Sequence, residues 1–130
     1  METREENRRA AYAYGIQAET VATLWLRAQL YAILDRNYRV QGGEIDIVAR
    51  RGRTIAFVEV KARGALEDAA IAITPQKQRR FRRAANRWLA THPWAADFTL
   101  RADAIFIARG RLPRHVENAF TLEGGMVNAF

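Results

Sequence analysis

The chain has 130 residues, 49% of them hydrophobic, and it contains no cysteine. That length supports one hydrophobic core, and the missing thiols exclude disulfides and thiolate metal sites. No apolar run approaches the roughly 20 residues of a membrane span, and residues 1–9 lack the apolar centre of a signal peptide. We therefore expect a soluble cytoplasmic protein. The formal net charge of +7 and the sequence pI of about 10.7 favour a polyanionic partner such as nucleic acid.

Hydrophobic periodicity predicts seven elements in the order α-β-β-β-α-β-β, which is typical of a mixed sheet with helices on its faces. We expect a single α/β domain over residues 15–120, between a flexible segment at 1–14 and a tail at 121–130. The first helix has one apolar face, with Glu19 at its margin. In chain order we expect a helix over 15–27, a strand over 30–34 that 36–43 either ends or continues, a hairpin over 44–61, a helix over 74–91, and strands over 98–108 and 115–119.

The expected hairpin places charged side chains inside strongly apolar strands. Glu44 and Asp46 project from one face of the first strand, and Glu59 and Lys61 from one face of the second, because residues two apart share a face. A two-residue turn at Gly52-Arg53 would set Asp46 opposite Glu59 and Glu44 opposite Lys61. A turn one residue earlier would slide the register by two and keep the same shared face. Opposed carboxylates repel, so either Lys61 or a bound cation should lie between them.

An ordinary solvated strand face with a weak ion pair is the alternative interpretation. Charges within apolar strands argue against it, because each buried charge needs a partner or a function. Lysine is also scarce: Lys61 and Lys77 are the only two among 21 Lys and Arg residues. Arginine cannot replace a compact ammonium that acts as a point charge, which indicates a specific role for Lys61.

A set of motifs accompanies this hairpin between residues 15 and 120. They are Gly15-Ile16-Gln17-Ala18-Glu19, Arg36-Asn37-Tyr38-Arg39, Gly43-Glu44-Ile45-Asp46, Phe57-Val58-Glu59-Val60-Lys61, Thr74-Pro75-Gln76-Lys77-Gln78, Asp103 in an apolar strand, and Asn118-Ala119-Phe120. In this combination the chain resembles the YraN-type family of small bacterial proteins, which are assigned to the restriction-endonuclease-like, PD-(D/E)xK fold. The resemblance implies a nuclease core with Asp46 as the first acid and Glu59 and Lys61 as the (D/E)xK pair. It also implies Glu19 as the extra helix acid found in archaeal Holliday junction resolvases.

On this resemblance we expect metal-assisted phosphodiester hydrolysis, with Mg²⁺ or Mn²⁺ as the cofactor. Asp46 and Glu59 offer the hard oxygen ligands that these ions prefer, and the Val60 backbone carbonyl adds a third, as in nucleases of this fold. Lys61 would orient the attacking water or stabilise charge in the transition state. Two further acids, Glu19 and Glu44, are second-line candidates for metal binding, water positioning or general-base catalysis.

The second helix is strongly basic. Thr74 is its expected N-cap, and Pro75 occupies its first position. Phe81, Ala84, Ala85, Trp88 and Leu89 form its apolar face. The opposite face carries four arginines, which we expect to contact phosphates together with Lys77: Arg79, Arg80, Arg83 and Arg87. The alternative is a solvated helix surface. Gln78, beside the apolar face, is expected to be either an amide at the core edge or a support for the site.

Two other classes of function remain open on the sequence. One is a non-catalytic nucleic-acid-binding or assembly module on a nuclease scaffold, and the other is a structural adaptor whose acids are ion-paired. We expect nucleic acid as the partner, DNA before RNA, with a homodimer as an option and no membrane association. Asp103 is equally consistent with a structural partner of an arginine, and His92 and His115 are expected to be surface or turn residues.

Overall fold

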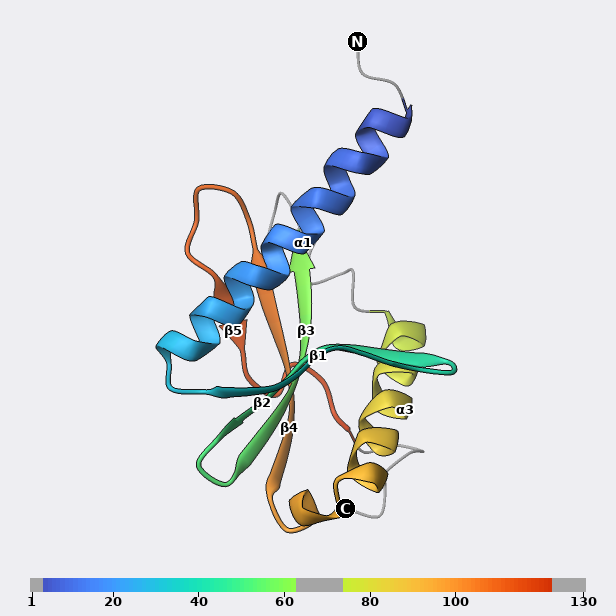
Figure 1. Ribbon diagram of the computed structural model, residues 1–130, viewed down its shortest axis with the longest axis vertical. Coiled ribbons are helices and arrows are strands. Elements are labelled where there is room, and N and C mark those ends of the chain that lie inside the picture. Colours follow the sequence, from blue (N-terminus) through green and yellow to red (C-terminus); the bar gives the residue numbers. More distant parts are fainter. Residues whose placement is uncertain (1–3, 63–73, 123–130) are drawn as a thin grey trace.

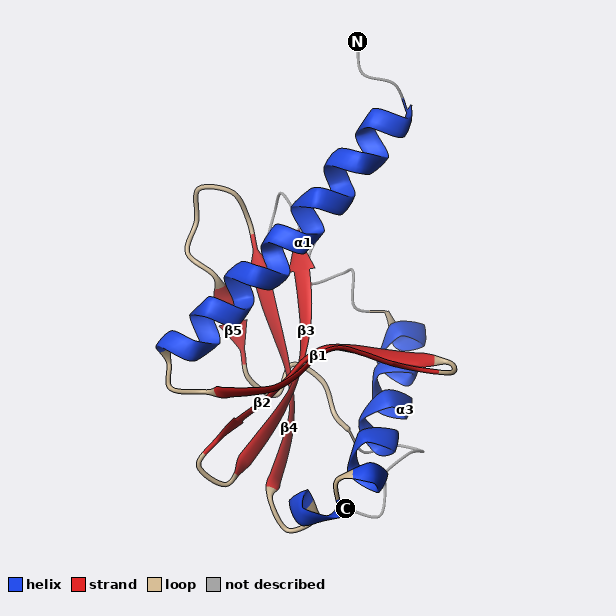
Figure 2. Ribbon diagram, viewed as in Figure 1, coloured by secondary structure: helices blue, strands red, loops and turns tan. Residues whose placement is uncertain are grey.

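Five strands form one mixed sheet in the order β1-β2-β3-β4-β5 (Figures 1 and 2). The computed structural model describes residues 4–62 and 74–122, so the remainder of the expected end segments at 1–3 and 123–130 lies outside the described residues. The elements are α1 (Arg4–Ala28), β1 (Ala32–Val40), β2 (Gly43–Arg51), β3 (Thr54–Ala62), α3 (Pro75–Thr91), the 3-10 turn η1 (Pro93–Ala95), β4 (Thr99–Ile107) and β5 (Arg114–Val116). The predicted α-β-β-β-α-β-β order and the single α/β domain are confirmed.

The strand directions follow from how the strands are connected. β1, β2 and β3 form consecutive antiparallel pairs, and β5 is antiparallel to β4. β3 and β4 are parallel. The connection between them contains α3, which returns the chain to the end of the sheet at which β3 begins, so that β4 runs in the same direction. This connection sets the first turn of α3 beside the carboxyl end of β3, where the candidate site lies.

The two helices cover opposite faces of the sheet (Figure 1). α1 packs Ala18, Ala22 and Leu26 against a core that includes Ile47 and Val58. The amphipathic α3 packs its predicted apolar face against the opposite face of the sheet. The second core consists of Phe81, Ala84, Ala85 and Trp88 with Ile45, Val48, Ile55, Phe57, Ala95, Ala102 and Leu122.

The hairpin register is the one that the two-residue turn predicts. Arg51 pairs with Thr54 and Ile47 with Val58, and Gly52 takes the positive φ of 61° that such a turn requires. The pairing with β3 ends at Ile47, while residues 43–45 continue to pair with β1. The predicted pairs of Asp46 with Glu59 and of Glu44 with Lys61 are therefore not formed in the ladder. The tip of the β1–β2 hairpin therefore leaves the sheet and crosses α3 (Figure 1).

Gly43 holds that crossing in place. A Cβ at Gly43 would lie 2.3 Å from the Arg80 carbonyl oxygen and 3.0 Å from the Ala84 nitrogen, distances that only a glycine avoids. At the neighbouring Gly42, with φ of 81°, a Cβ would meet the Arg83 guanidinium at 2.3 Å. The hairpin backbone thus rests directly on the backbone of α3 and forms one wall of the site.

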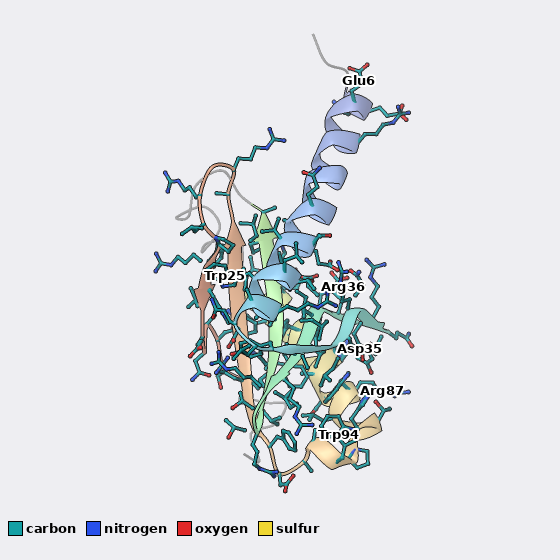
Figure 3. All side chains as sticks on the ribbon, turned by 60° about the vertical axis from the view of Figure 1, so that its left-hand side comes forward. Glu6, Trp25, Asp35, Arg36, Arg87 and Trp94 are labelled. Carbon is teal, nitrogen blue, oxygen red and sulfur yellow. The ribbon has the colours of Figure 1, made fainter. Side chains whose placement is uncertain are left out.

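Three element boundaries differ from the sequence predictions, one of them at β5, which ends at Val116 instead of continuing to Ala119. α1 begins at Arg4 rather than near residue 15, and its first turns extend beyond the sheet with Glu6 at the far end (Figure 3). Acidic residues in the first turn suit the helix dipole, and Arg9 pairs with Glu5 at 2.9 Å. At the other end Leu30 adopts a positive φ of 71° and ends the helix, so that β1 starts at Ala32. None of the described helices is long and apolar enough to cross a membrane.

Candidate active site

Asp46 lies where β2 separates from β3. Its Oδ2 accepts a hydrogen bond from the Val60 backbone N–H at 2.7 Å, which replaces the ladder bond lost at this point. Burial raises the pKa of Asp46 from 3.8 to about 8; Glu59 and then Glu19 add to the rise, while Val60 and Lys61 oppose it. The Asp46 carboxyl is therefore largely protonated at neutral pH when no cation is near.

Glu59 and Lys61 form a shielded ion pair on the same strand. The Lys61 Nζ lies 2.9 Å from the Glu59 Oε1, and their side chains are only 11% and 16% exposed respectively. Burial disfavours the ammonium, but the Glu59 carboxylate outweighs that effect and the pKa of Lys61 is raised. This confirms that the second strand projects both side chains to one face. The low exposure of this pair argues against the alternative interpretation, in which the two side chains form a weak ion pair on a solvated strand face.

Glu19 reaches the same region from α1. Its Oε1 accepts hydrogen bonds from the Asn37 Nδ2 at 2.8 Å and from an Arg36 nitrogen at 3.4 Å. Asn37 has a positive φ of 53°, a conformation that asparagine adopts more easily than most residues. Sequence reasoning placed Arg36 and Asn37 in a family motif and missed their role of holding Glu19. An asparagine within an expected strand or loop was the available signal, because it marks an irregular backbone.

Glu44 is more exposed and pairs with Arg39 across the β1–β2 hairpin at 3.5 Å. With Glu59 and Lys61 it borders a cavity of about 480 Å³ between the hairpin and α3. The remaining lining residues come from the first turns of α3: Thr74, Gln76, Lys77 and Arg80. Asp46 is not among the lining residues, so the predicted face is shared by the other three charged side chains, while Asp46 turns to the Val60 amide.

The basic helix contributes to the cavity through fewer residues than expected. Thr74 caps it as predicted, with its hydroxyl accepting from the Lys77 N–H at 3.2 Å. Arg80 and Lys77 line the cavity, whereas Arg79, Arg83 and Arg87 are exposed along the helix, with Arg87 at the end near Trp94 (Figure 3). Gln78 is half-buried and does not line the cavity. Sequence reasoning missed Gln76 and Thr74 as lining residues.

Asp103 belongs to a separate buried network. It is fully buried and accepts from Arg101 at 2.8 and 2.9 Å, from the Asn118 N–H at 3.1 Å, and pairs with the His115 Nε2 at 2.7 Å. Burial works against ionisation, but hydrogen bonds from His115 and Arg101 lower the pKa of Asp103. The arginine-partner interpretation is confirmed, and this network ties β5 to β4.

The histidines differ from each other. His115 is not a surface residue, because its side chain is only 8% exposed against Asp103. His92 is the C-cap of α3, in agreement with the predicted turn position, and its ring stacks on that of Trp88 with the centroids 3.9 Å apart.

The acidic residues fit a divalent cation by their chemistry. Within residues 4–62 and 74–122, no three His, Cys, Asp or Glu side chains are grouped to hold a metal by themselves. Mg²⁺ normally needs only one or two carboxylates, with water and substrate oxygens completing its shell. Asp46 and Glu59 could be those ligands, with the Val60 carbonyl as the expected third ligand. Burial is the main cause of the raised pKa of Asp46, and Glu59 and Glu19 add to it; a bound cation would offset the contribution of these two acids.

Comparison with known proteins places the chain in a family. The model of "Uncharacterised protein family UPF0102" matches residues 18–107, which include Glu19, Asp46, Glu59, Lys61 and Lys77. A UPF0102 protein of Methylocella silvestris is 58% identical over 120 residues, covering 92% of this chain and 97% of the relative. UPF0102 proteins of Methylorubrum extorquens and Bradyrhizobium diazoefficiens are 56% and 57% identical, covering 90% and 85% of this chain and 91% and 84% of the relatives. The chain belongs to the UPF0102 family, the YraN-type family that its motifs indicated.

Proposed function

We propose that this protein is a metal-dependent endonuclease with a restriction-endonuclease-like fold, which hydrolyses phosphodiester bonds in nucleic acid, DNA before RNA. One observation supports this most strongly: two largely shielded carboxyls on adjoining strands, Asp46 and Glu59, lie so close that ionising both is unfavourable, and a shielded Lys61 lies beside them. Such an arrangement costs stability, and strongly shifted pKa values of this kind cluster at functional sites.

Each residue has a role that follows from its contacts. Mg²⁺ or Mn²⁺, when bound, would lower the pKa of a water and polarise a phosphoryl oxygen. The Val60 N–H fixes the orientation of Asp46, and the Asn37 amide fixes that of Glu19. Lys61, held by Glu59, would place a positive charge where negative charge develops on the reacting phosphate.

The surface around the site suits a polyanion. Lys77 and Arg80 line the cavity, and further arginines follow along α3. The sequence from residue 69 to 96 contains no acidic residue, so the positive charge of α3 is not neutralised along its own length. Contacts of this kind position the backbone of a nucleic acid without reading its sequence.

A non-catalytic nucleic-acid-binding module is the competing function. The close Glu59–Lys61 pair supports it, since both groups already satisfy each other. The same pair is compatible with catalysis if substrate and metal compete for these two side chains.

A cleavage screen separates the two functions. The parent protein and Lys61→Ala would be incubated with branched, flapped, duplex and single-stranded DNA and RNA in Mg²⁺ or Mn²⁺, and binding would be measured in Ca²⁺. We expect the parent to cut at least one substrate, and Lys61→Ala to bind that substrate without cutting it. Binding without any cleavage by the parent would favour the module, and absence of both would contradict a nucleic-acid function.

A further inference from the structure

Both lysines of this chain line the same cavity. Lys61 comes from the carboxyl end of β3 and Lys77 from the first turn of α3, and the two side chains lie against each other. They are the only lysines in the sequence, and the other 19 of its 21 Lys and Arg residues are arginines. The only two lysine ammonium groups of the chain therefore converge on one cavity, which Arg80 also lines.

The cavity collects positive charge at the start of α3. Lys77 occupies the first turn of this helix, which contains no acidic residue of its own. Among the acids that line the cavity, Glu59 pairs with Lys61, and Glu44 pairs with Arg39 on the hairpin. An anion placed between the two ammonium groups would be attracted by both.

The size and chemistry of the space narrow the choice of anion. The cavity volume of about 480 Å³ falls within the roughly 300–1,000 Å³ of typical small-ligand sites, so it admits a group the size of one nucleotide. Gln76 adds an amide that can donate to an oxygen, and Arg80 adds a planar donor suited to phosphate. Among residues 4–62 and 74–122, every side chain that lines the cavity is polar or charged, which suits an anion better than an apolar ligand.

We propose that Lys61, Lys77 and Arg80 form a phosphate clamp, in which the non-bridging oxygens of one nucleotide phosphate contact both ammonium groups. The inference rests on the proposed function for its source of phosphate, a nucleic acid strand, and assigns Lys77 as a substrate-binding residue of the same site. Phosphoryl oxygens are the recognised group, and they are shared by a nucleotide and by free phosphate.

The scarcity of lysine makes a direct spectroscopic test practical. Protein labelled with ¹³C at the lysine ε carbon should give two ε-methylene signals, which Lys77→Arg assigns. Thymidine 3′,5′-bisphosphate and inorganic phosphate would be titrated in separate arms, without metal. We expect the bisphosphate to shift both signals to saturation with one dissociation constant, about tenfold tighter than inorganic phosphate because its second phosphate adds a charge-assisted contact.

Two variants sharpen the test. Lys77→Gln should weaken bisphosphate binding about tenfold, a loss typical of one charge-assisted hydrogen bond, while its melting temperature stays near that of the parent. Arg82→Gln removes one positive charge from the same helix outside the cavity, and should leave the affinity as in the parent. An equal loss in both variants would mean a diffuse charge effect and would overturn the clamp.

The clamp and the nuclease function can fail separately. A shift of the Lys61 signal alone, or shifts that do not saturate, would overturn the clamp even if the protein cuts nucleic acid. Saturable shifts of both signals in a protein that cuts nothing would support the clamp and contradict the nuclease. Equal affinity for the bisphosphate and for inorganic phosphate would show that the site binds free phosphate, and would overturn the proposal that it recognises a nucleotide.

Discussion

Asp46 carries a carboxyl that burial and two neighbouring acids keep protonated at neutral pH. Its pKa is raised from 3.8 to about 8, so the folded protein holds a proton that the unfolded chain loses between these values. The stability that neutral Asp46 contributes is complete below about pH 4 and is lost as the pH rises through about 8.

Asp46→Asn should remove this pH dependence. The amide keeps the shape of the protonated carboxyl and cannot titrate. Without metal, the free energy of unfolding of the parent should fall relative to that of the variant as the pH rises from 5 to 9. Urea unfolding of both proteins across that range measures the difference, in which the other titrating groups cancel. Parallel curves for the two proteins would show that Asp46 is ionised in the folded state throughout.

Asp103 illustrates the opposite case, a buried carboxylate with a full set of donors. Replacing it with alanine leaves Arg101 uncompensated and the Asn118 N–H without its acceptor, so we expect Asp103→Ala to lose about 3–5 kcal/mol of unfolding free energy. Asp97→Ala is the matched control: Asp97 also pairs with an arginine but is 77% exposed, and it should lose about 1 kcal/mol at most. Equal losses in urea unfolding at pH 7 would contradict the structural role assigned to Asp103.

Among the elements, α3 both lines the cavity and presents arginines to solvent. If Arg79, Arg83 and Arg87 contact phosphates, the salt dependence of duplex binding should fall by about 0.9 in log-log slope per lost contact, or about 0.7 on single strands. Replacing all three with glutamine should flatten the slope by roughly two to three units. Lys61→Ala should keep most of it, because one lysine makes about one contact.

The affinity for nucleic acid would be measured from low to moderate salt, with Ca²⁺ in place of Mg²⁺ or Mn²⁺ so that the nucleic acid is not cleaved. An unchanged slope in the triple variant would show that these arginines do not contact phosphates and form an ordinary solvated surface. The two cavity residues, Lys77 and Arg80, would then be the remaining candidates for phosphate contact on this helix.

Elements specified by local chemistry could be predicted from the sequence. The β2–β3 register follows from the turn at Gly52, and the start of α3 follows from Thr74 and Pro75. The bend that takes Asp46 to the Val60 amide could not be predicted, because it depends on the contact of Gly43 with α3, which is distant in sequence. The early start of α1 was missed because its first turn is charged and shows no apolar face.

At the scale of the whole molecule, the sheet gathers acids from three elements at one end and the basic helix beside them. The motifs predicted which acids meet: Glu19 from α1, Asp46 from β2 and Glu59 from β3. They did not predict that Lys77 would join Lys61, since that proximity depends on how α3 packs against the sheet. Family membership agrees with the motifs, and the proposed chemistry depends on whether these acids bind a metal ion.

Calorimetric titration of the metal-free protein with Mn²⁺ tests that claim most directly. The parent should bind Mn²⁺ at one site, and Asp46→Asn and Glu59→Gln should each lose that binding while remaining folded by circular dichroism, because each keeps the side-chain shape and removes an anionic ligand. Asp97→Asn, which removes an exposed acid, should bind as the parent does. Binding of Mn²⁺ by both site variants with the affinity of the parent would show that Asp46 and Glu59 are not a metal site.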